Sequence, residues 1–142
     1  MKMKLFTFLF TISAIFITGC SSTYDSETIY DDSTIEEISA VREMNFESSK
    51  TNAYARIASR TDLSEAAQVR LVKAVFDELS FDSSKSTVLL TLIDNPAFCP
   101  AAETAIMKRL GRLSFESTKN NILTAVNAVK TLHSEERDSI SQ

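Results

Sequence analysis

Apolar side chains recur three or four residues apart along most of the chain, which is the spacing of one face of an α-helix. The pattern falls into six segments between residues 34 and 133. Their apolar positions are Ile35, Ile38 and Val41; Tyr54, Ile57 and Ala58; Val72, Val75, Phe76 and Leu79; several positions within 83–93; Ile106, Leu110 and Leu113; and Ile122, Ala125, Val126, Val129 and Leu132. We therefore expect an all-α domain of about six helices.

The ends of these segments carry helix start and stop signals. Ser64 is placed to cap the third segment, and Pro100 suits the first turn of the fifth. The fourth segment ends at Asp94-Asn95-Pro96, a turn sequence. Only 2 Gly and 2 Pro occur in 142 residues, which are too few for the many turns of a β-sandwich or β-barrel.

Between the predicted helices, one five-residue pattern occurs three times: Phe, an acidic residue, two Ser or Thr residues, and Lys. The copies are 46–50, 81–85 and 115–119, so their first residues lie 35 and 34 positions apart. This near-constant spacing predicts three tandem helix-turn-helix repeats that form a small bundle or a short α-solenoid.

The repeated turn also predicts part of the core. We expect each Phe to turn back into the core as a hydrophobic staple, while the acidic residue and Ser cap the next helix and Lys faces solvent or pairs with an acid. On this interpretation, Phe81→Ala would cost about 3–5 kcal/mol of stability. The predicted core residues are Phe46, Phe81, Phe115, Val72, Phe76, Ile106, Leu110, Val126 and Val129.

The three turns, each with an apolar helix on either side, resemble the bacterial family called domain of unknown function 4476. The resemblance spans roughly residues 35–132 and departs at 95–100, where Asn-Pro-Ala-Phe-Cys-Pro replaces the opening seen at Leu63-Ser64. It implies a small helical fold, often found in secreted or lipid-anchored proteins, and no established activity. Tetratricopeptide repeats have a similar period, but their signature is missing here.

The first nineteen residues are typical of a bacterial lipoprotein signal peptide. Lys2 and Lys4 precede 13 uncharged residues, 5–17, a run shorter than the roughly 20 residues of a membrane-spanning helix. The run leads into Ile17-Thr18-Gly19-Cys20, which resembles the lipobox. We therefore expect cleavage before Cys20 and attachment of acyl chains, such as palmitate, to Cys20. The alternatives are an ordinary signal peptide with a chance Cys, or an uncleaved N-terminal anchor.

These features divide the chain into a signal peptide (1–19), a lipidated Cys20 with a flexible acidic tether (20–33), a helical-repeat domain (34–133) and a polar tail (134–142). Losing Lys2 and Lys4 with the signal lowers the formal net charge from −4 to −6. Attachment to the membrane therefore depends on the acyl chains. The acidic charge also argues against nucleic-acid binding. Ser21, in the position that sorts lipoproteins, indicates an outer membrane and a domain facing the periplasm.

Candidates for chemistry are scarce. With Cys20 lipidated, Cys99 cannot form an intramolecular disulfide, and we expect it to be buried; the alternative is a disulfide between chains. His133 is the single His, and its expected role is a cation at the C-terminus of the last helix. Gly111 is the single Gly after residue 19, which argues against nucleophile elbows and phosphate loops. We expect no catalytic residue, no cofactor and no metal.

The sequence therefore favours a lipid-anchored envelope protein whose helical domain binds a protein partner or acts as a scaffold. One alternative is an envelope enzyme with an unrecognised site, which would need a pocket on which His133 or several carboxylates converge. Another is a lipid-anchored inhibitor or structural spacer.

Overall fold

The computed structural model describes the backbone of residues 26–140 and the side chains of residues 33–132. This part of the chain contains six α-helices, one 3₁₀ turn and no strand, which confirms the predicted all-α class. The elements are α1 (Ser26–Arg42), α2 (Glu47–Ala58), α3 (Glu65–Glu78), α4 (Asp82–Ile93), α5 (Pro100–Met107), η1 (Leu110–Arg112) and α6 (Glu116–Ile140).

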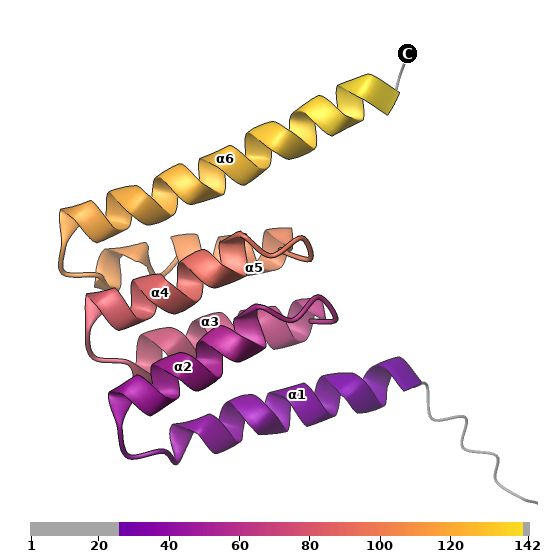
Figure 1. Ribbon diagram of the computed structural model, residues 1–142. Coiled ribbons are helices and arrows are strands. Elements are labelled where there is room, and N and C mark those ends of the chain that lie inside the picture. The colour runs from indigo at the N-terminus through magenta and orange to yellow at the C-terminus, as the bar shows by residue number, and fades with distance from the viewer. Residues whose placement is uncertain (1–25, 141–142) are drawn as a thin grey trace, which may run out of the picture.

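The helices lie in two layers (Figure 1). In one layer α2 packs on α4 and α4 on α6, and in the other α1 packs on α3 and α3 on α5. The connections α1–α2, α3–α4 and α5–α6 consequently lie along one edge, and α2–α3 and α4–α5 along the opposite edge. We call the first edge, formed by residues 44–47, 79–82 and 113–116, the turn edge. The tandem-repeat relationship itself stays a prediction.

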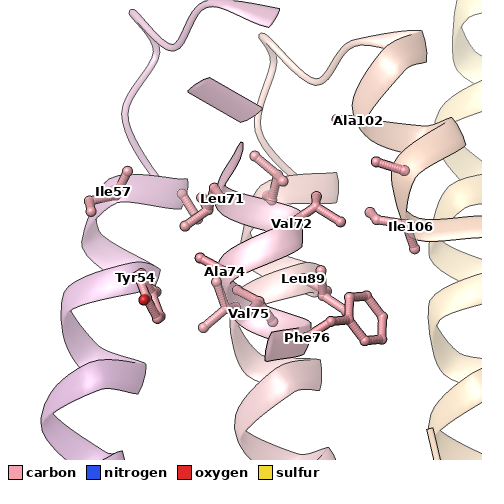
Figure 2. Close-up of a cluster of buried hydrophobic side chains, with 14 of the residues drawn as sticks. Tyr54, Ile57, Leu71, Val72, Ala74, Val75, Phe76, Leu89, Ala102 and Ile106 are labelled. Carbon is pink, nitrogen blue, oxygen red and sulfur yellow. The ribbon is translucent and has the colours of Figure 1, made fainter. Parts of the chain in front are cut away.

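The core lies between the layers, and α2 and α4 supply it from corresponding positions. α2 buries Ala53, Tyr54, Ile57 and Ala58. α4 buries Val88, Leu89, Leu92 and Ile93, and each of these stands 35 residues after its counterpart in α2. Positions i, i+1, i+4 and i+5 form one continuous helix face. The facing surface of α3 supplies Leu71, Val72, Val75 and Phe76 (Figure 2).

The predicted core is right on the helices and wrong in the turns. Val72, Phe76, Ile106 and Val126 are buried, and Leu110 and Val129 are half-buried against the core. Phe46, Phe81 and Phe115 are instead 73%, 65% and 64% exposed. Because Phe81 buries little area, Phe81→Ala is expected to cost less than about 1 kcal/mol, well below the 3–5 kcal/mol that a core Phe would cost.

Two helices run past the predicted domain boundaries. α1 begins at Ser26, inside the predicted tether 20–33, and α6 continues to Ile140, through most of the predicted polar tail. Neither segment contains Gly or Pro, so no residue in it interrupts the helix at the predicted boundary. The predicted signal peptide, Cys20 and residues 21–25 lie outside the described residues.

Two buried amides hold the loops at the opposite edge. Asn95 donates from Nδ2 to the carbonyls of Ala58 and Arg60, both at 2.7 Å, and its Oδ1 accepts from Ala97 N at 2.9 Å. Gln68 donates from Nε2 to Leu63 O (3.2 Å) and Ala97 O (2.7 Å), and accepts from Cys99 N at 3.1 Å. These bonds join the α2–α3 and α4–α5 loops and satisfy backbone groups that water does not reach.

Cys99 differs from its predicted buried state. It is half-buried and occupies the N-cap of α5, where its Sγ accepts from Ala102 N at 3.4 Å. The thiol thus occupies the position that Ser64 holds before α3, where Ser64 Oγ accepts from Ala67 N at 3.0 Å. Sulfur is a weak acceptor, so this cap is the weaker of the two.

Most exposed side chains of α6 before Leu132 are polar. Asn120, Asn121, Thr124 and Asn127 are exposed, and Asn127 stands 34 residues after the buried Ile93 of α4. A stack of helices needs a polar terminal face to stay soluble. This face closes the layer formed by α2, α4 and α6.

Asn95 supplies the first stability prediction. Asn95→Ala leaves two carbonyls and one N–H without their partner, so we expect the free energy of unfolding to fall by about 2–3 kcal/mol. Chemical denaturation measures the loss, and Asn52→Ala, at an exposed position of α2, is the control. Equal stability of the two variants would show that the Asn95 bonds contribute nothing.

Tyr54 gives a second prediction about stability. Its side chain is fully buried, and its hydroxyl has no hydrogen-bond partner among the described residues. Burial, with the Glu78 carboxylate as a smaller cause, raises the pKa of Tyr54 to about 12. We expect Tyr54→Phe to keep or raise the free energy of unfolding at pH 7, by up to about 1 kcal/mol, because a buried unpaired hydroxyl is removed.

The same pKa fixes a pH dependence for Tyr54. The folded value lies above the unfolded value of 10, so stability falls as pH rises from 10 towards 12. Tyr54→Phe should lose less stability than the parent protein over this interval, as measured by chemical denaturation. A steeper loss in the variant, or a lower stability at pH 7, would contradict the assignment.

Candidate interaction surface

The three exposed Phe residues lie at the turn edge, one in each turn. Phe46 and Phe81 are the N-cap residues of α2 and α4, with extended backbone at φ −104°, ψ 129° and φ −86°, ψ 135°. Their carbonyls accept the first helical hydrogen bonds, from Lys50 N at 3.0 Å and Lys85 N at 3.1 Å, and the Phe115 carbonyl accepts from Lys119 N at 3.2 Å. The Phe side chains leave the helices towards solvent, so the predicted staple is wrong.

The acidic residue that follows each Phe joins its turn to the next one. Glu47 Oε1 accepts from the backbone N–H of Ser80 (3.1 Å) and of Phe81 (2.9 Å). Asp82 Oδ2 accepts in the same way from Ser114 (2.6 Å) and Phe115 (2.9 Å). We expected these acids to cap their own helices. Instead, each one satisfies two donors of the following turn, one helix pair further along.

The third acid of the series, Glu116, has no following turn to join. Its side chain is 78% exposed and accepts from Lys119 Nζ at 2.6 Å. Glu116 is therefore the unlinked counterpart of Glu47 and Asp82 within the described chain.

The lysines of the three turns lie close to acids. Pairing with an acid was one of the two predictions for these lysines, and facing solvent was the other. Lys50 Nζ is 3.4 Å from Glu78 Oε2. Lys85 is buried, with Nζ 3.8 Å from Asp82 Oδ1 and donating to Ser80 O at 3.4 Å. Because these ammonium groups are engaged beside acids, the turn edge presents Phe side chains without a free basic cluster.

The Glu47 carboxyl shows the electrostatic result of its contacts. Partial burial tends to raise its pKa, but hydrogen bonds from Phe81 N, Ser84 and Ser80 outweigh this, and the pKa of Glu47 lies below its usual value. Hydrogen bonds to a carboxylate favour the ionised form. The link between the first two turns is thus a charge-assisted interaction at neutral pH.

The exposed surface of the three turns is polar and includes the charged side chains of Glu43, Arg112 and Glu116. Met44 adds a fourth apolar side chain, 39% exposed, and the exposed neighbours are largely Ser and Asn. Leu132, 61% exposed, is the fifth large exposed apolar side chain within 33–132 and lies away from this edge, on α6. Exposed aromatics gathered on one edge are typical of an interaction surface.

The other residues considered from sequence are not brought to this edge. Cys20 and the His133 side chain lie outside the described residues, and α6 continues past His133 to Ile140, so this residue is not at the helix end as predicted. Glu36 and Glu37 are exposed on α1, where Glu37 accepts from Arg60 at 2.8 Å. Over the described part, no cluster of three potential metal ligands and no helix suited to span a membrane is found.

Comparisons of the chain with models of known protein families, with curated proteins and with solved structures each found no match. The resemblance to the domain of unknown function 4476 therefore stays a prediction.

The exposure of the Phe residues was missed from sequence, although a signal was present. Each Phe stands alone between polar residues, in Asn-Phe-Glu, Ser-Phe-Asp and Ser-Phe-Glu. An isolated Phe in a turn is compatible with either a staple or an exposed anchor. The packing of the turns in three dimensions distinguishes the two.

The carboxylate links give a prediction with an internal control. Glu47→Ala and Asp82→Ala should lower the free energy of unfolding by about 1–3 kcal/mol each, with Asp82 the larger effect because Lys85 loses a buried partner. Glu116→Ala should change it by less than about 0.5 kcal/mol. Chemical denaturation at pH 7 distinguishes the three variants, and equal effects at all three sites would refute the linking role.

The Glu47 link should also depend on pH. A lowered folded pKa means that its stabilisation is present above the unfolded value of 4.5 and is lost as pH falls through the folded value. The stability difference between the parent protein and Glu47→Ala should accordingly shrink below about pH 4. A difference that stays constant from pH 7 to pH 3 would contradict this.

Proposed function

We propose that this protein is a lipid-anchored interaction module of a bacterial envelope that presents the exposed Phe row of its turn edge to a protein partner. The observation that carries the proposal is the alignment of Phe46, Phe81 and Phe115, each about two-thirds exposed or more, on one edge. Aromatic anchors dominate the binding energy of many protein interfaces.

The proposed anchor is Cys20, at the outer membrane with the domain in the periplasm. Five residues lie between Cys20 and the start of α1 at Ser26, and an extended chain spans at most about 20 Å over this distance. The 17 residues of α1 extend about 26 Å, and the turn edge begins where α1 ends. The helix thus separates the lipid-bearing end of the domain from the Phe row, which leaves that row accessible to a partner.

Several features favour a protein partner over a lipid surface at the turn edge. Residues 34–133 contain 12 basic and 12 acidic residues, and Lys50 and Lys85 lie beside acids, so the turn edge offers no net attraction to an anionic membrane. Helices packed side by side have axes about 8–10 Å apart, which sets the approximate spacing of the turns. A partner helix advances about 10.5 Å in seven residues, so apolar side chains at heptad spacing would meet successive Phe rings.

The repeat prediction belongs to the same proposal. We infer three tandem helix pairs, and the equivalent bonds made by Glu47 and Asp82, 35 residues apart, support this. On this view the Phe row is a repeated contact, one ring from each unit.

The test is photo-cross-linking in the native envelope. A benzophenone amino acid at position 81 should capture a partner, whereas the same probe at position 132, also an exposed apolar site, should not. The combined Phe46→Ser, Phe81→Ser and Phe115→Ser variant should keep its melting temperature within a few degrees, because little area is buried, and should lose binding to the purified partner at least about tenfold. Leu132→Ser should keep binding.

Two results would reject the proposal. Equal capture at positions 81 and 132 would show that the Phe row is not the interface, and undiminished binding by the folded triple variant would show the same. Metabolic labelling with a fatty-acid probe tests the anchor separately: Cys20→Ala should lose the label, and equal labelling of both forms would reject lipidation there.

A further inference from the structure

A second surface, on the layer of α1, α3 and α5, has a different chemistry. Here an open groove of about 670 Å³ is lined by Ile35 of α1, by Ala66, Val69, Arg70 and Lys73 of α3, and by Arg109, which follows α5. Glu65 is the single acid in this lining. The groove therefore combines an apolar floor with three cationic side chains, in a chain whose formal net charge is −4.

The three cations are not equally engaged. Lys73 Nζ lies 2.7 Å from Asp77 Oδ2, and Arg109 Nη1 donates to Ala105 O at 3.1 Å. No ion pair or hydrogen bond of the Arg70 guanidinium occurs within the described part of the chain, and Arg70 is half-buried. A guanidinium beside an apolar floor is suited to bind a carboxylate through two parallel hydrogen bonds.

We propose that this groove binds a single-chain anionic amphiphile, an alkyl chain ending in a carboxylate. The carboxylate would pair with Arg70, with Lys73 and Arg109 adding positive charge, and the alkyl chain would lie on Ile35, Ala66 and Val69. This assignment concerns a different surface from the Phe row and does not depend on it.

The size of the groove favours a small amphiphile over a protein helix. Its volume lies within the roughly 300–1,000 Å³ of small-molecule sites. Its floor consists of one Ile, one Val and one Ala side chain, which is enough for an alkyl chain. Occupation by a protein segment is the alternative, and the competitor peptide described below tests it.

The experiment uses the full chain with Cys20→Ala, which removes the lipid attachment point, and follows methyl NMR signals of Ile35, Ala66 and Val69. The probes are dodecanoate, dodecyltrimethylammonium and dodecyl maltoside, each below its micelle-forming concentration. Dodecanoate should shift these three signals saturably. The cationic and neutral probes, which lack the carboxylate, should bind at least about fivefold more weakly.

Variants connect the binding to Arg70. Arg70→Gln should weaken dodecanoate binding at least about fivefold, Arg70→Lys should retain part of it, and Arg56→Gln, at an exposed arginine on α2, should leave it unchanged. The melting temperature of each variant checks that the fold is intact. Saturable binding that Arg70→Gln leaves unchanged would overturn the assignment.

Three further outcomes would also overturn it. These are the absence of a saturable shift with dodecanoate, equal affinity for the cationic probe, and shifts confined to the turn edge. A peptide of residues 26–38, in which acidic and apolar residues alternate in short runs, serves as a competitor of dodecanoate that represents a protein ligand. Tighter binding of this peptide than of dodecanoate would identify the groove as a protein site.

Discussion

Hydrogen bonds from the backbone of one turn to the carboxylate of the preceding turn are the interaction on which the turn edge depends. The N–H groups that precede a helix have no partner within it, and they must be satisfied by another group. Glu47 and Asp82 satisfy two such donors each, across the boundary between successive helix pairs. One side chain thereby fixes the position and the direction of the next pair.

The exposure of the Phe residues follows from this arrangement. Phe46 and Phe81 have extended backbone, the carbonyl of each of the three Phe residues begins the following helix, and in two of the three turns the Phe N–H is bound by the preceding acid. With these backbone groups fixed at the edge, the side chain is directed away from the core. An aromatic ring in water is unfavourable by itself, and its repetition in three turns is the physical basis of the proposed contact with a partner.

The opposite edge is held by amides instead of carboxylates. Asn95 and Gln68 each bind backbone groups of both adjoining loops, and both are buried. α3 and α5 are thus held at both ends, by charged links at the turn edge and neutral ones at the opposite edge. α1 is joined to the α2–α3 loop by Arg60, which donates to Glu37 and Thr34. A groove whose walls come from α1, α3 and the end of α5 keeps its shape because these helices cannot slide independently.

The helical class, the number of helices and most of the core were predictable from the residues alone, because apolar spacing along a helix is a local property. Val72, Phe76, Ile106 and Val126 were identified in this way. The ends of α1 and α6 were less well determined, since no Gly or Pro marks them. The direction of the Phe side chains and the existence of the cationic groove could not be predicted in this way. Both depend on residues about 35 positions apart or on different helices, and their contacts arise only when the helix pairs are stacked.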